Sequence, residues 1–390
     1  MNSPLTSRWT IAALCMIGTA SCAHAQPLSH SVLAETFISL RINAYQQVNL
    51  VSSRPSDNPQ ILDPLLLDAW GIAIRPPGAG GHWWLNNTAS GTTTTYVGDT
   101  PTEPLFQDEL KVVTIPRGRI YEHLLDYVSQ PTGVVYTGHS STDFMVTGEG
   151  ITGPAKFVFC ALDGTLSAWT TNQTAAVNMV DDSASGAMFT GLAASERASG
   201  NLLYVCDFGL ERFRIFDHAF RELPVPAGKF RDPRIASTFS HYNCQVLSDG
   251  LLYVTFAYVG DDPGEEDRHP GYGYVTSFDL DGNIVKQYEH RLELNAPWGV
   301  AIAPDNFGPF SGQLIVGNFG DHRVMAFSRT TGRFLDFLRA PDRKPIEIDG
   351  LWGLQFGNGV RLGYTNHLYF AAGPEEEEEG LFGKLVPLTP

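Results

Sequence analysis

The chain has 390 residues, of which 43% are hydrophobic and 17% are charged, so it can bury a large core and lacks the composition of a disordered chain. Its 42 acidic residues outnumber its 26 basic ones and leave a net charge of -16. This balance argues against DNA or RNA as a partner, because phosphate binding needs a basic surface.

The first 25 residues have the pattern of a secretory signal peptide. Arg8 provides a weakly basic start, residues 11–19 form a short apolar core, and Ala23-His24-Ala25 matches the small-x-small cleavage rule. The apolar core is about half as long as the ~20 residues that span a membrane. We therefore expect cleavage after Ala25, export to the periplasm or the exterior, and no membrane span.

Residues 26–44 form an N-terminal lead-in, and a repeat begins after them. A short apolar strand with a small residue near its start recurs along the chain, with successive markers 53 to 62 residues apart. The markers are Gly71, Gly133, Gly191, Cys244, Gly299 and Gly353. A period of this length that covers almost the whole chain is typical of a β-propeller.

Each unit continues with further short β-rich runs separated by Gly, Asp and Asn turns, which predicts four strands per unit. We therefore predict an all-β, six-bladed β-propeller of NHL- or TolB-like type over residues 45–388. The last unit provides only three strands of its own. Residues 47–51 have the pattern of the missing outer strand, and the N-terminal strand is therefore predicted to close the last blade.

Three cysteines follow the signal peptide, namely Cys160, Cys206 and Cys244. Two of them end similar apolar runs, where a cysteine is usually a small buried hydrophobe. The sequence leaves undecided whether two of the three form a disulfide. The literal GxGxxG at residues 148–153 is expected to be a loop, because a strand rather than a helix follows it.

Several segments resemble known proteins. Residues 314–324 resemble the core of an NHL repeat, and residues 45–52, 296–301, 307–312, 348–354 and 372–383 resemble a family of uncharacterised exported bacterial propellers. Some members of that family carry PEP-CTERM anchors. This chain ends at Leu388-Thr389-Pro390 without a hydrophobic tail, so we expect a soluble monomer. The resemblance implies the fold and transfers no catalytic residue.

Two acidic clusters, residues 261–267 and 375–379, are predicted to join the second and third strands of the fourth and sixth units. Such runs are either solvated charge that aids solubility or a site for Ca²⁺, which prefers dense carboxylate oxygens. Both lie on the face where the innermost strands begin. At that face the candidate metal ligands are Asp207, Asp321, Asp349 and Glu375.

The same face is predicted to carry aromatic and amide side chains around the channel mouth. The candidate ligand-binding residues are Trp70, Asn243, Trp298, Asn318 and Trp352. The tryptophans are either packing wedges between blades or an aromatic floor for a flat ligand. The partner at this face is expected to be a small molecule, a carbohydrate or a protein.

Two functions remain open at this stage. The first is a binding module that uses the channel-mouth face. The alternative is a calcium-dependent hydrolase similar to six-bladed lactonases and phosphotriesterases, which need a Glu, Asn and Asp set around one ion. No catalytic residue is assigned, and whether the chain is an enzyme is left open.

Overall fold

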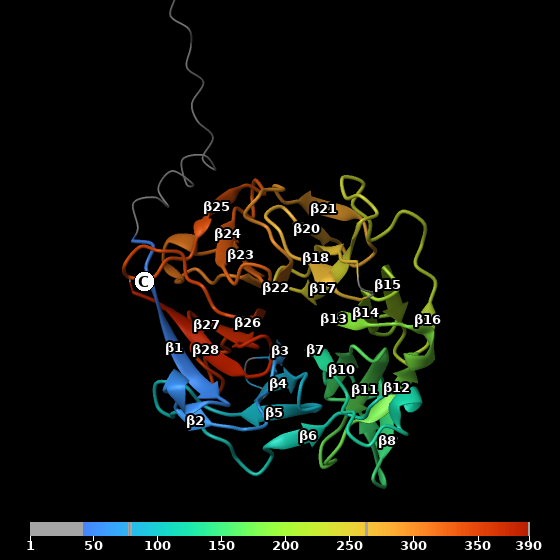
Figure 1. The fold of residues 1–390 in the computed structure, drawn as a ribbon. Coiled ribbons are helices and arrows are strands. Elements are labelled where there is room, and N and C mark those ends of the chain that lie inside the picture. The colour runs from blue at the N-terminus through green and yellow to red at the C-terminus, as the bar shows by residue number, and fades with distance from the viewer. Residues whose placement is uncertain (1–41, 77, 79, 262–263, 389–390) are drawn as a thin grey trace, which may run out of the picture.

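The computed structural model describes residues 42–388, apart from 77, 79, 262 and 263. Within these residues, six sheets surround one central axis, and no α-helix is present (Figure 1). The predicted six-bladed β-propeller is thus confirmed. The predicted signal peptide and most of the lead-in lie outside the described residues. Within the described part of the chain, no helix has the length and apolar character needed to span a membrane.

The first three blades run from the innermost strand to the outermost. Blade 1 contains β3 (Ala69–Ala73), β4 (Trp83–Asn87), β5 (Thr92–Tyr96) and β6 (Val112–Thr114). Blade 2 contains β7 (Pro131–Tyr136), β10 (Phe157–Ala161), β11 (Thr165–Trp169) and β12 (Val177–Asp181), with the hairpin β8 (Met145–Gly148) and β9 (Ile151–Pro154) inserted after β7. Blade 3 contains β13 (Phe189–Ser195), β14 (Leu202–Asp207), β15 (Arg212–Phe216) and β16 (Glu222–Leu223).

The other three blades repeat this order. Blade 4 contains β17 (Phe239–Val246), β18 (Leu252–Val259), β20 (Gly273–Phe278) and β21 (Ile284–Gln287), with the short β19 (Glu266–Asp267) beside β18. Blade 5 contains β22 (Pro297–Ile302), β23 (Leu314–Asn318), β24 (Val324–Phe327) and β25 (Phe334–Phe337). Blade 6 contains β26 (Leu351–Phe356), β27 (Leu368–Ala372), β28 (Leu381–Pro387), β1 (Tyr45–Ser52) and β2 (Ile61–Leu62). The described 3₁₀ turns are η1 (Pro55–Asp57), η2 (Arg119–Tyr121), η3 (Ser183–Ser185) and η4 (Gly308–Phe310).

The N-terminal strand closes the ring as predicted. β1 pairs antiparallel with β28, with Gln47 opposite Leu385 and Ser52 opposite Leu381. In Figure 1 the blue N-terminal strand accordingly lies beside the red C-terminal strand. The pairing removes the free edge that β28 would otherwise present.

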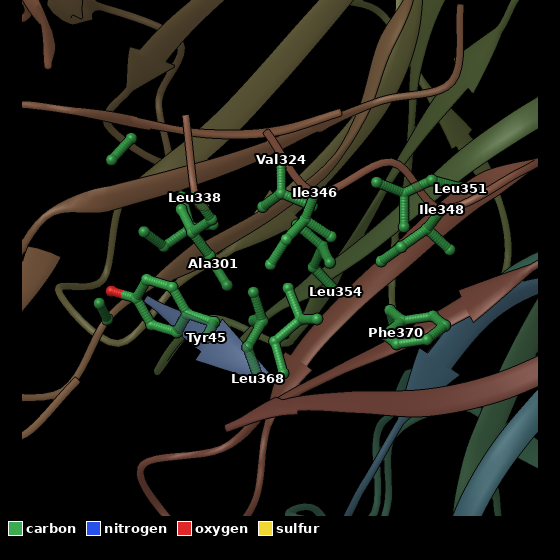
Figure 2. Close-up of a cluster of buried hydrophobic side chains, with 14 of the residues drawn as sticks. Tyr45, Ala301, Val324, Leu338, Ile346, Ile348, Leu351, Leu354, Leu368 and Phe370 are labelled. Carbon is green, nitrogen blue, oxygen red and sulfur yellow. The ribbon is translucent and has the colours of Figure 1, made fainter. Parts of the chain in front are cut away.

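The core lies mainly between the blades. Six clusters of buried apolar side chains in the described residues each join two neighbouring blades. Figure 2 shows the cluster of blades 5 and 6, in which Tyr45 of β1 lies near Leu368 and Ala301. The Tyr45 hydroxyl donates a hydrogen bond of 3.0 Å to the Phe307 carbonyl, so the closing strand is also fastened to blade 5.

The glycines that mark the repeat lie where neighbouring innermost strands touch. A Cβ atom on Gly299 would lie 2.5 Å from the Trp352 carbonyl oxygen, and one on Gly353 would lie 2.5 Å from the Trp70 carbonyl oxygen. Real Cβ atoms essentially never approach this closely. Blade 4 has Cys244 at this position, and there the side-chain amide of Asn243 donates to the Trp298 carbonyl at 2.9 Å. The repeated glycine is therefore explained by close contact between the blades.

All three described cysteines are free and buried. Burial raises the pKa of the Cys160 thiol to about 12. The interpretation of the cysteines as small buried residues is therefore confirmed.

Candidate functional site

An aromatic cluster fills the axis at the end where the innermost strands begin. The Trp70 and Trp352 rings stack with centroids 3.5 Å apart, and the Trp298 ring lies 6.0 Å from both in edge-on contacts. The cluster also contains Phe208, Tyr242 and Phe319, and Leu162 packs against it, so every blade contributes a side chain. Trp298 of blade 5 contacts the Trp70 ring of blade 1 and donates a hydrogen bond to Thr190 of blade 3, so the cluster extends across the axis and closes this end of the channel. We call this group the axial cluster.

The indole N–H groups of the axial cluster all have acceptors. Trp70 and Trp352 donate to the two carboxyl oxygens of Asp68 at 2.8 and 3.2 Å, and Trp298 donates to the Thr190 carbonyl at 3.0 Å. Burial, followed by the charge of Glu377, raises the pKa of Asp68 well above its usual range. These contacts favour the packing interpretation of the three tryptophans.

A central cavity of about 270 Å³ lies on the axis behind the axial cluster. Its walls are formed by the innermost strands, including Gly71, Gly133 and Gly353, and Trp298 and Asn243 also line it. The lining continues to the ends of these strands at Gln245 and Gln355 and reaches His139 and Glu196. The last two side chains are 34% and 66% exposed, so the cavity opens at the face opposite the axial cluster.

Polar and aromatic side chains from blades 1 to 3 follow one another along this open rim. His139 Nε2 lies 3.2 Å from a carboxylate oxygen of Glu196, which gives the imidazole a negative partner. The Tyr136 and His139 rings meet edge-on with centroids 4.8 Å apart. The Arg75 guanidinium lies 5.9 Å from the Tyr136 ring centroid, within the range of a cation–π contact.

The structure separates the five predicted ligand-binding residues. Trp298 and Asn243 line the central cavity, whereas Trp70 and Trp352 are packed within the axial cluster. Asn318 is fully buried, and its side-chain amide donates to the Glu293 carbonyl at 2.7 Å and to Asp321 at 2.8 Å. The axial cluster therefore fills the end at which an open mouth was expected, and ligand binding by these five residues stays a prediction.

The sequence reasoning missed the residues of the opposite rim. These residues lie in the last part of an innermost strand or just beyond it, namely Arg75, Tyr136, Glu196, Gln245 and Gln355. The available signal was a polar or aromatic residue near the end of the innermost strand in five units. The tryptophans that recur at the starts of these strands favoured the other end of the channel instead.

The predicted metal ligands do not come together. Asp207 is buried in blade 3 and accepts from Arg212 at 3.1 Å, whereas Asp321 accepts from Asn318 in blade 5. Asp349 and Glu375 are neighbours, since the Glu375 backbone N–H donates to the Asp349 carboxylate at 3.0 Å. Among the described residues, no three His, Cys, Asp or Glu side chains are arranged to hold a metal ion. Calcium binding by these four residues stays a prediction.

The glutamates of residues 375–379 do not behave as one solvated run. The side chain of Glu375 pairs with Arg54, and that of Glu379 accepts a hydrogen bond from Ser53. Glu377 is half-buried, and burial, followed by the charge of Glu266, raises its pKa to about 7. Both Glu377 and Asp349 line a surface cavity of about 370 Å³ on the closed face.

No model of a known protein family matches the chain. An uncharacterized protein of Acanthamoeba polyphaga mimivirus is 28% identical over 350 residues, which are 87% of this chain and 80% of the relative. A second uncharacterized protein of that virus is 32% identical over 202 residues, which are 48% of this chain and 50% of the relative. Because these relatives are viral, the bacterial origin and the export implied by the resemblance stay predictions.

The chain is similar to several solved structures, all at low sequence identity. A luciferin-regenerating enzyme is 13% identical with a TM-score of 0.47, covering 83% of this chain and 94% of its own. The β-propeller domain of a Myceliophteria thermophila protein is 12% identical with a TM-score of 0.44, covering 82% of this chain and 84% of its own. A protein of unknown function from Bacteroides thetaiotaomicron is 10% identical with a TM-score of 0.48, covering 82% of this chain and 70% of its own. Such low identities carry no information on activity.

Proposed function

We propose that this chain is a binding module whose ligand is a small polar molecule held in the central cavity. The observation that carries the proposal is a cavity of about 270 Å³ on the axis, closed at one end by the axial cluster and bordered by polar side chains at the other. A concave site with a few convergent polar groups is the usual place for a small ligand.

The lining fits a small polar molecule better than a large apolar one. Glycines on three innermost strands place backbone atoms at the wall, where a ligand can approach closely. Gln245 and Gln355 provide neutral amides from blades 4 and 6. His139 and Glu196 add an imidazole and a carboxylate at the open rim. These groups can donate and accept hydrogen bonds around most of the rim.

A panel of sugars, nucleotides, amino acids and carboxylic acids, screened by native mass spectrometry and followed by calorimetry, tests this function. We expect at least one saturable ligand with a stoichiometry of one. Gln245→Trp would fill the cavity and abolish binding, whereas Gln46→Trp on the exposed face of β1 would leave binding unchanged. Both variants should keep the far-ultraviolet circular dichroism of the parent.

Two results would contradict the proposal. One is a panel without any saturable ligand, and the other is a ligand whose affinity is the same in Gln245→Trp and in the parent. The calcium-dependent hydrolase is separated from the binding module by elemental analysis of protein purified without chelator. Stoichiometric calcium together with turnover of a lactone or phosphotriester would favour the hydrolase.

A further inference from the structure

The side chain of Arg75 lies at the open rim without a hydrogen-bonding partner among the described residues. It follows β3 in the chain and lines a second cavity of about 370 Å³. This rim cavity shares Tyr136, His139, Gln245 and Gln355 with the central cavity, so the two spaces adjoin. A molecule held in the central cavity would therefore have the Arg75 side chain beside its outer end.

The guanidinium of Arg75 has no acceptor among the described residues. Its Nε atom is buried and makes no hydrogen bond, and the side chain forms no ion pair there. Leaving a buried donor unpaired is unfavourable, and more so when the group is charged. Other half-buried arginines of the described chain do have acceptors, as Arg117 does with three backbone carbonyls.

The surroundings of Arg75 hold the side chain in place without neutralising its charge. Its aliphatic stem packs against the backbone at Gly81, and its guanidinium faces the Tyr136 ring. The rim carboxylate of Glu196 interacts with His139, whose ring contacts that of Tyr136. The other rim arginine, Arg197, is paired with Asp281. Arg75 thus combines a place beside the central cavity with a buried Nε that has no acceptor among the described residues.

We propose that Arg75 binds the anionic group, a carboxylate or a phosphate, of the ligand held in the central cavity. The inference rests on the proposed function and specifies the ligand class. A guanidinium matches carboxylate and phosphate geometry with two parallel hydrogen bonds, and an oxygen acceptor would satisfy the buried Nε. Because the protein carries a net charge of -16, its overall field repels anions, and a single oriented guanidinium supplies the local attraction.

The test uses three sugars that differ only in the group at carbon 6, titrated by calorimetry against the full chain. D-glucuronate carries a carboxylate, D-glucose 6-phosphate carries a phosphate, and D-glucose is neutral. We expect at least one of the two anions to bind at least tenfold more tightly than D-glucose. Arg75→Gln should lose that preference, whereas Arg361→Gln, an exposed arginine in the loop that joins β26 and β27, should keep it.

Each outcome is decisive for one of the two proposals. Binding of D-glucuronate alone identifies a carboxylate ligand, and binding of D-glucose 6-phosphate alone identifies a phosphate ligand. Equal binding of all three sugars, unchanged in Arg75→Gln, overturns the anionic class while the cavity remains a binding site. Failure of both anions to bind while a neutral ligand of the wider panel depends on Gln245 overturns the anionic class in the same way. If nothing in the wider panel binds, the proposed function itself fails.

Discussion

The tryptophans of the axial cluster are held by hydrogen bonds and ring contacts that decide between packing and ligand binding. Two Trp side chains that share one buried acid, Asp68, cannot turn toward a ligand without leaving their indole N–H groups unpaired. Trp298 is 4% exposed and crosses between blades 3 and 5. This arrangement favours the packing interpretation over the aromatic floor.

We predict that Trp298→Ala lowers the free energy of unfolding by about 3–5 kcal/mol, because it removes a buried ring and leaves a cavity. Urea unfolding followed by circular dichroism measures the loss. Trp298→Phe keeps part of the packing and should lose less. A loss below about 1 kcal/mol in Trp298→Ala would contradict the packing role.

A pH dependence is expected from Glu377. Its pKa is raised to about 7 in the folded protein, first by burial and then by the charge of Glu266, whereas the unfolded chain has the ordinary value near 4.5. Between these values the folded state binds more protons than the unfolded state, so this group's contribution to stability falls as pH rises from about 4.5 to about 7. Above pH 7 the stabilisation is lost.

Thermal unfolding at pH 5 and pH 8 tests this dependence in Glu377→Gln. The variant should melt close to the parent at pH 5 and above the parent at pH 8, because the amide resembles the protonated acid. Glu376→Gln changes an exposed neighbour in the same loop and should follow the parent at both values. Equal melting of Glu377→Gln and the parent at pH 8 would argue against the raised pKa.

At the scale of single elements, β1 completes blade 6 and contributes to two cores. Tyr45 belongs to the cluster of blades 5 and 6, and Leu50 and Val51 belong to the cluster of blades 6 and 1. All three are fully buried. The strand therefore both covers the β28 edge and fills space between blades.

We predict that deletion of residues 1–52 leaves an open ring that aggregates, because β28 then has unpaired backbone groups. Light scattering after size-exclusion chromatography measures the association. The matched control is deletion of residues 1–41, which leaves all of β1 in place. A monomeric 53–390 chain with the melting temperature of the control would contradict the closure role.

The loop before β28 has an unusual backbone conformation. Glu375, Glu376 and Glu377 have φ values of 57°, 56° and 69°, a left-handed conformation that costs roughly 1–2 kcal/mol per residue. Contacts with Ser53, Arg54 and Asp349 hold the loop in this conformation. A bound Ca²⁺ would add to that support.

If the loop binds Ca²⁺, the parent melts higher in millimolar calcium by mass action, since the ion binds the folded state. Replacing all five glutamates of residues 375–379 with glutamine should remove that shift. Glu109→Gln, an exposed glutamate of blade 1, serves as the control and should keep it. The absence of a calcium-dependent shift in the parent would rule out this site.

At the scale of the whole molecule, the ring has two unlike ends. The end where the innermost strands begin is closed by the axial cluster and carries the acidic loops. The opposite end opens into the central cavity and carries Arg75. Small anionic ligands are therefore expected at the open end, and cations at the closed end.

The closed ring predicts one cooperative unfolding transition. Six clusters join neighbouring blades, the axial cluster joins blades across the axis, and β1 leaves no free blade edge at the closure. Urea transitions followed by far-ultraviolet circular dichroism and by tryptophan fluorescence should coincide. Two separated transitions would show that some blades unfold independently.

The repeat and the closing strand were determined by the sequence alone, because both depend on local patterns. Short apolar strands, turn residues and a small residue at the contact between innermost strands recur in nearly every unit, and the last unit lacks one strand that residues 47–51 can supply. Which end of the channel is open was decided only in three dimensions. It depends on Trp70, Trp298 and Trp352 meeting across the axis although they are far apart in the chain. The Arg75 Nε, which has no acceptor among the described residues, could not be predicted for the same reason. Whether a donor lacks an acceptor is known only when the neighbours of its side chain are in place.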